Sequence, residues 1–467
     1  MDPSYQRGPY TGLDWVQATH LYERVIASEN EALQIRATVE LGWLSEDVPE
    51  SILAQMVPIL VELLGRPLGD HQPSIQEAAA YCLNCFTRRG DGALCMHVGQ
   101  SGAIPSILGL LPQSAGRFQR ILAKCLRNIV SCDSLSRVIL ARNGGLEVIL
   151  DVIASCSDDT RPYLLEILSA LVMVREVRRV LVNLDGLSLL IESAGNGKMV
   201  SRTRAAHAIG LLGVTRRLRQ KLVDLGVIPV LVGLLQDGDM LAKLTAGNAL
   251  GIISSHVDYL RPVARAGAIP LFAELLEGPD PLGKEIAEDV FCILAVAEEN
   301  AVLIAGHLVR VLQGGNDEAK AAAADVLWDL SGYKHSVSVV RESGAIPLLI
   351  GLLSCGNNDV REKAAGAVTQ LSYNEADRED LVNAGAVPIL LRLLHDESEE
   401  VKDNAAEALI NFSEDPSLSD RISEVFDIPA FQNILDRLAR IRASDEHMVR
   451  SLDRMNVEQF TEDPELA

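Results

Sequence analysis

A short glycine-led motif recurs along the chain at nearly constant spacing. Complete copies, which read Gly-Ala-Ile-Pro or a close variant, begin at Gly102, Gly226, Gly267, Gly344 and Gly385. Degenerate copies continue the same column at Gly144, Asp185, Gly306 and Phe426. Successive members lie 38 to 42 residues apart, and periods of this length are typical of tandem structural repeats. The chain is therefore predicted to be one array of stacked units rather than several separate globular domains.

Each unit has the pattern of three helices. Residues 375–382 form a first helix, and Gly385 stops it, because glycine tolerates the left-handed conformation at a helix end. Pro347 falls in the first turn of a strongly apolar second helix, where its missing N–H is not needed. The polar residues 357–359 can cap a third helix over 360–372, whose small and apolar residues cover more than one face. This third helix is predicted to be buried between neighbouring units.

The composition agrees with packed helices. Hydrophobic residues make up 48% of the chain but aromatic residues only 4%. The core must therefore be built from Leu, Ile, Val and Ala, which favours an all-α fold.

The three-helix unit marked by Gly-Ala-Ile-Pro resembles the armadillo repeat over residues 47–442. The resemblance implies a right-handed α-α superhelix of about nine to ten repeats, whose third helices line a concave groove. In character the repeats are similar to those of plant U-box ubiquitin ligases, although the residues before the first helix leave no room for a U-box.

The expected domain organisation follows from these bounds. Residues 1–16 form a flexible arm, residues 17–46 a helical cap, residues 47–442 the solenoid, and residues 443–467 an acidic tail. The unit around residues 297–311 is two or three residues short and lacks the proline, so we expect a local kink there. In the tail, Met448, Leu452 and Met455 form an apolar strip that is either a frayed helix or a segment that masks the groove.

Alignment of the third helices by their small buried residues predicts which side chains face the groove. The column just before the core residue, together with the column four positions later, gives the candidate partner-binding residues: Tyr81, Lys124, Asn128, His207, Asn248, Phe291, Asp325, Asp329, Gln370, Glu407 and Asn411. In importin-α these columns resemble a Trp and Asn ladder that grips localisation peptides. Here the first column has no Trp, so an importin-α-like transport receptor is kept only as an alternative.

Charge is unevenly distributed along the chain. The net charge is −22, which argues against a general nucleic-acid binder, yet residues 116–221 are net positive between two acidic segments. A basic stripe on one helix face adds Arg117, Arg120 and Arg127 to Lys124 among the candidates. We hypothesise that the N-terminal half of the groove binds an acidic segment and the C-terminal half a basic one. A nucleic-acid-associated protein that uses residues 116–221 remains the alternative.

No catalytic constellation is found, and no cofactor is expected. Cys82, Cys85, Cys95 and His97 suggest a zinc site, but Cys82 falls in the core column, where a small buried cysteine is ordinary. The function predicted is a non-enzymatic scaffold or adaptor that binds peptide segments or domains of other proteins. Scattered cysteines and the lack of an apolar leader or an 18-residue apolar stretch favour the cytoplasm or nucleus, without membrane insertion.

Overall fold

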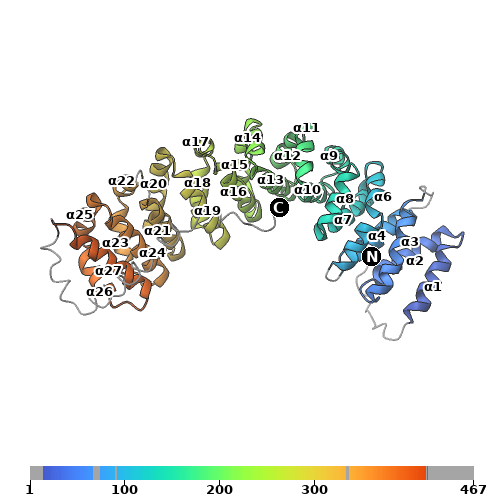
Figure 1. Cartoon of the computed structure of the whole chain (residues 1–467), viewed down its shortest axis with the longest axis horizontal. Coiled ribbons are helices and arrows are strands. Elements are labelled where there is room, and N and C mark those ends of the chain that lie inside the picture. The colour runs from blue at the N-terminus through green and yellow to red at the C-terminus, as the bar shows by residue number, and fades with distance from the viewer. Residues whose placement is uncertain (1–13, 67–73, 90–91, 333–335, 417, 419–467) are drawn as a thin grey trace, which may run out of the picture. The chain divides into compact units, whose positions relative to one another are not determined.

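The computed structural model describes residues 14–66, 74–89, 92–332, 336–416 and 418. All regular elements in these residues are helices, labelled α1 to α27 with one short 3₁₀ helix (Figure 1). They form two compact units, which we call unit 1 (residues 1–253) and unit 2 (residues 254–467). The all-α fold class is confirmed.

Unit 1 begins with four helices and continues with regular triplets. The first four are α1 (Trp15–Ile26), α2 (Glu31–Leu44), α3 (Glu50–Leu64) and α4 (Ile75–Phe86). The triplets are α5 (Ala93–Gln100), α6 (Ala103–Leu110) and α7 (Gly116–Cys132); α8 (Ser134–Arg142), α9 (Gly145–Ser155) and α10 (Arg161–Leu171); α11 (Arg175–Asn183), α12 (Gly186–Gly195) and α13 (Met199–Gly213); and α14 (Arg216–Asp224), α15 (Val227–Asp237) and α16 (Met240–Ser254). The 3₁₀ helix Leu111–Gln113 follows α6.

Unit 2 repeats the triplet with one exception. Its helices are α17 (Val257–Arg265), α18 (Ala268–Glu277), α19 (Pro281–Leu294), α20 (Glu298–Gly314), α21 (Asp317–Ser331), α22 (Val337–Glu342), α23 (Ala345–Leu352), α24 (Asn358–Ser372), α25 (Glu375–Asn383), α26 (Ala386–Leu393) and α27 (Glu399–Ser413). The predicted arm is described only from Asp14 onward, and the predicted tail lies outside the described residues. The predicted cap region contains most of α1 and all of α2.

The repeated glycine makes the turn between the first and second helix of a unit. Gly385 has φ 87° between α25 and α26, in the left-handed region where a Cβ would be strained. Among the described residues, Asp185 is the one non-glycine with positive φ, at 55°. It occupies the glycine column between α11 and α12, which confirms that this degenerate copy makes the same turn.

The irregular repeat around residues 297–311 differs from its neighbouring repeats in one helix. Where the neighbouring repeats have a first and a second helix, α20 runs without interruption over 17 residues. Gly306 lies inside it, no proline follows, and the left-handed turn is missing. The shortening seen in the sequence is therefore the loss of one turn and the fusion of two helices.

Two columns of cationic or amide side chains hold the helix ends, and sequence analysis missed both. Near the start of the third helices, Gln76, Gln119, Arg161, Arg202 and Arg361 each donate to a carbonyl at the end of the preceding second helix, at 2.9 to 3.3 Å. In the first helices, the Nε of Arg137, Arg178, Arg219 and Arg378 donates to the end of the preceding third helix, at 2.6 to 2.8 Å. Carbonyls at a helix C-terminus lack partners within the helix and carry partial negative charge, so cations stabilise them.

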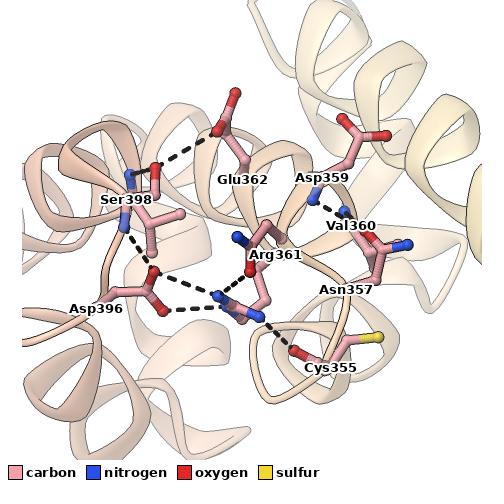
Figure 2. A network of polar contacts seen from close by, with 10 residues as sticks. Cys355, Asn357, Asp359, Val360, Arg361, Glu362, Asp396 and Ser398 are labelled. Carbon is pink, nitrogen blue, oxygen red and sulfur yellow. Dashed lines mark hydrogen bonds and ion pairs between the residues drawn. The ribbon is translucent and has the colours of Figure 1, made fainter.

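Arg361 shows how one such side chain also links two repeats (Figure 2). Its guanidinium donates to both carboxylate oxygens of Asp396, at 3.1 and 3.3 Å, and to the carbonyl of Cys355. The N–H of Ser398 donates to the same carboxylate at 3.0 Å. The side chains of Arg361 and Asp396 are only 14% and 9% exposed, so this ion pair is largely shielded from water.

No single helix in the described parts of the chain is both long and apolar enough to span a bilayer. One bent pair, α5 with residues 103–113, meets the length and composition limits only when its two members are taken together.

Replacing Arg361 with Gln is expected to destabilise unit 2 by about 2–3 kcal/mol, because Asp396 loses both guanidinium bonds inside the protein. Although burial opposes it, the N–H of Ser398 and the guanidinium of Arg361 hold the pKa of Asp396 below its usual value. This stabilisation is present above the ordinary aspartate pKa and is lost as the pH falls through the lower folded-state value. The effect of the substitution should therefore shrink in acid.

Urea denaturation and amide hydrogen exchange in α23–α27 measure the effect of Arg361→Gln. Arg310→Gln serves as the control, since Arg310 is exposed on α20. Equal effects of the two substitutions would contradict the assignment.

Candidate functional site

The third helices of each unit pack side by side and share one exposed face. In unit 1, α4, α7, α10 and α13 are successive neighbours, and in unit 2 the neighbours are α19, α21, α24 and α27. We call the exposed side of each row the third-helix face. Most of the predicted partner-binding residues lie on it, with three exceptions described below.

The basic stripe of unit 1 forms a ladder of ion pairs with carboxylates from adjacent repeats. Arg120 and Lys198 lie 3.6 and 2.6 Å from Asp159, and Arg127 and Arg204 lie 3.4 and 2.8 Å from Glu166. Arg117 lies 3.4 Å from Glu77. Each carboxylate on α10 or its leading loop thus lies between a cation of α7 and one of the α13 region. We call these residues, with Lys124, the basic ladder.

Lys124 lies at the centre of the basic ladder and contacts an aromatic ring. Its Nζ is 5.2 Å from the ring centroid of Tyr163 on α10, and the guanidinium carbon of Arg127 is 5.7 Å from the same centroid. Cations at this distance are attracted by the ring. Six cations in the ladder share three carboxylates, so its surface keeps a positive excess.

Polar side chains continue the face at both sides of the ladder. His207 on α13 and Asn248 on α16 are exposed, and Tyr81 on α4 is partly exposed. Desolvation, with the charge of Arg204 added to it, lowers the pKa of His207, so this imidazole is neutral at pH 7. Burial raises the pKa of Tyr81 to about 12.

The corresponding face of unit 2 carries carboxylates. Asp325 on α21 lies 3.0 Å from the Nζ of Lys363 on α24, and the exposed Asp329 accepts a hydrogen bond from the thiol of Cys292, at 3.3 Å. Gln370 and Glu407 are partly exposed, and Glu407 accepts a hydrogen bond from the hydroxyl of Tyr373. Within the described rows, the two units therefore present faces of opposite charge.

Two predicted groove residues are buried, and their prediction was wrong. Asn128 is 8% exposed and donates to Asn84 at 3.3 Å and to Thr87 at 3.0 Å. Asn411 is 4% exposed and donates to Ser372 at 2.8 Å. Both lie where a third helix packs against the preceding one, so their amides join neighbouring repeats instead of meeting solvent.

Phe291 was also assigned wrongly, because the alignment placed α19 two residues out of register. Phe291 is 0% exposed and packs edge to face on Phe272, with ring centroids 6.3 Å apart. The core position of α19 is Val290, so the exposed Asp289 takes the place of Phe291 on the face. Asp289 follows Asn248 by 41 residues. A strict 41-residue spacing would have identified Asp289 as the face residue, but the alignment followed the small side chain of Cys292.

Sequence analysis also missed an aromatic residue of the unit 2 face. Trp328 on α21 is partly exposed and lies against α24 at Gly366. It is adjacent to the column that was inspected, and its contact with Gly366 has no signature in either helix alone. The ion pairs made by Asp159, Glu166 and Lys363 were missed for the same reason, since they join different repeats.

Glu288 on α19 is the most strongly perturbed carboxylate of this region. Burial first, and then the negative charge of Asp325, raise its pKa to about 7, although Lys363 opposes the shift. No group of three or more His, Cys, Asp or Glu side chains is arranged to hold a metal ion in the described residues. Burial raises the pKa of the Cys82 thiol, which lies in the core.

The raised pKa of Glu288 predicts a pH-dependent stability. The protonated form is favoured in the folded chain, so this stabilising contribution is present below the ordinary glutamate pKa and is lost as the pH rises through about 7. Glu288→Gln should therefore gain roughly 1–2 kcal/mol over the unchanged protein between pH 5 and 8, allowing for solvent screening. Urea midpoints across this range measure it, with the exposed Glu274→Gln as control. Parallel pH profiles for Glu288→Gln and the parent would refute the assignment.

Comparison with known proteins agrees with the repeat architecture. A family model for the armadillo/beta-catenin-like repeat matches residues 334–373 and 374–413. The crystal structure of an engineered protein from the Northeast Structural Genomics Consortium aligns with a TM-score of 0.66 and 22% identity, over 84% of this chain and 98% of that one. Computationally designed armadillo repeat proteins for modular peptide recognition align with a TM-score of 0.40 and 22% identity, over 48% of this chain and 99% of that one. No curated protein matches.

The family match falls on the two repeats made by α22–α24 and α25–α27. The same three-helix unit with its left-handed turn recurs in both units of the structure. The chain therefore contains two repeats that match the armadillo family, at residues 334–413, within a fold of recurring three-helix repeats.

Proposed function

We propose that this chain is a non-enzymatic protein-interaction scaffold that binds extended segments of other proteins along its third-helix faces. The observation that carries the proposal is the recurrence of one exposed or partly exposed polar side chain on successive third helices. In unit 1 these side chains are Tyr81, Lys124, Glu166, His207 and Asn248, and in unit 2 they include Asp289, Asp325 and Glu407.

The repeat geometry suits an extended polypeptide. Packed helices lie 8–10 Å apart, while an extended chain advances about 3.3 Å per residue. About every third residue of a bound segment would therefore lie beside the next third helix. Because the helices are held by their neighbours, little conformational freedom is lost on the scaffold side when a segment binds.

Charge selects different segments for the two faces. The basic ladder of unit 1 favours an acidic segment, and the carboxylates of unit 2 favour a basic one. The ladder supports a protein partner over nucleic acid, because Glu77, Asp159 and Glu166 lie among its cations. Those carboxylates would repel a phosphate backbone, whereas an acidic peptide can place single side chains beside chosen cations.

Two charge-reversal pairs test the assignment in the full chain. Binding of labelled peptides that repeat Glu-Ser-Gly or Arg-Ser-Gly is measured by fluorescence anisotropy at about 50 and 300 mM salt. The double variant Arg120→Glu, Lys124→Glu should lower the affinity for the acidic peptide roughly ten- to hundredfold and make its binding less dependent on salt. The double variant Asp289→Lys, Asp329→Lys should have the same two effects on binding of the basic peptide.

The matched control is Arg216→Glu with Arg217→Glu, an equal charge change on the exposed part of α14. If the control weakens the acidic peptide as much as the ladder variant, binding follows net charge and the proposal fails. Tighter binding of single-stranded RNA or DNA than of either peptide, lost in the ladder variant, would favour the nucleic-acid alternative instead.

A further inference from the structure

The unit 2 face contains an aromatic surface built by two repeats. Trp328 of α21 packs against α24 at Gly366, where an added Cβ would lie 2.3 to 2.6 Å from three carbons of the indole ring. Residue 366 must therefore lack a side chain for the ring to take this position. Trp328 nevertheless remains partly exposed, so part of the indole faces solvent on the third-helix face.

A cation of the protein itself already lies beside this ring. The Nζ of Lys363, one turn before Gly366 on α24, is 5.9 Å from the ring centroid of Trp328 and 3.0 Å from Asp325. Asp325 is one turn before Trp328 on α21. The ring and the carboxylate thus form two sides of a cation site, and the lysine side chain, itself partly exposed, occupies it.

The surroundings have more negative charge than Lys363 can balance. Glu288 and the exposed Asp289 lie on α19, and the exposed Asp329 lies one residue beyond the ring on α21. Within the described residues, Lys363 is the cation that acts on Glu288, and the negative charges of Asp325, Asp289 and Glu285 outweigh it. The site therefore favours an additional or stronger cation.

We propose that the ring of Trp328 and the carboxylate of Asp325 form a subsite for an arginine side chain of a partner protein, and that Lys363 is a built-in competitor for it. This inference rests on the proposed binding of basic segments to unit 2. Arginine fits better than lysine, because its planar guanidinium stacks on an indole, pairs with a carboxylate through two N–H groups and is more weakly hydrated.

Competition by Lys363 predicts that binding of an arginine peptide becomes stronger when the lysine charge is removed. An arriving guanidinium must displace the ammonium from Asp325 or share the ring with it, so the lysine weakens apparent affinity. Removing its charge should strengthen binding of an arginine peptide, whereas a lysine that only supported the fold would weaken binding or have no effect.

Trp328 can be observed selectively, since the chain has three tryptophans. With Trp15→Phe and Trp43→Phe in place, Trp328 is the sole tryptophan and can be excited at wavelengths that tyrosine does not absorb. The full chain is titrated with a Gly-Ser peptide that has a single central arginine between two lysines, and with the same peptide carrying neutral citrulline in place of that arginine. Indole emission should change on addition of the arginine peptide and much less with the citrulline peptide.

In this background, Lys363→Met is expected to raise the affinity for the arginine peptide roughly five- to tenfold. The affinity for the citrulline peptide should stay nearly unchanged. Trp328→Leu, followed by anisotropy, should abolish the preference for arginine over citrulline. The matched control is Lys402→Met, which removes one positive charge from the neighbouring α27, where Lys402 pairs with Glu399.

Any of three results would refute the subsite: no gain in affinity for the arginine peptide in Lys363→Met, an equal gain in Lys402→Met, or an unchanged preference for arginine over citrulline in Trp328→Leu. If binding then still depends on Asp289 and Asp329, the proposed function stands and only the subsite is refuted. If neither peptide binds any variant, the proposed binding of basic segments to unit 2 fails as well.

Discussion

Close packing between successive third helices is the interaction on which the rest of the structure depends. Small residues make it possible: Ala205, Ala206 and Ala208 of α13 and Ala364, Ala365 and Ala367 of α24 are all 0% exposed. Where the approach is closest, glycine replaces alanine, as Gly366 does beneath Trp328. This packing aligns one polar position from each repeat on a shared face. It also brings Asp159 and Glu166 between cations of two neighbouring repeats.

Features with a local cause could be predicted from the sequence. The glycine column specifies a left-handed turn in most repeats, although Gly306 lies inside α20 without one. The proline specifies the first turn of the second helix, and both features depend on a few adjacent residues. Residues whose surroundings come from another repeat could not be assigned this way. Asn128 and Asn411 occupy the predicted column, yet each is buried by the preceding third helix. Phe291 shows a second limit, because an alignment that followed the small side chain of Cys292 departed from the regular 41-residue spacing of the repeats.

The charge of residues 116–221 has two physical origins that net charge alone does not separate. Arg137, Arg178 and Arg219 hold the ends of α7, α10 and α13 and belong to the framework. Arg120, Lys124 and Arg127 lie on the third-helix face and are partly exposed. The sequence positioned the stripe correctly along α7 but did not indicate that its cations pair with carboxylates of adjacent repeats. A basic segment in a repeat protein is therefore better interpreted position by position within the repeat than as a total.

The arginines at the helix ends have a consequence for chemical robustness. A guanidinium keeps its proton at every pH at which proteins remain intact, so these end contacts persist under alkaline conditions that would neutralise an ammonium. Lys284, which donates to the carbonyl of Gly278 at the end of α18, holds the equivalent place in its repeat. Gln76 and Gln119 do the same with uncharged amides, so this position requires a hydrogen-bond donor rather than one particular side chain.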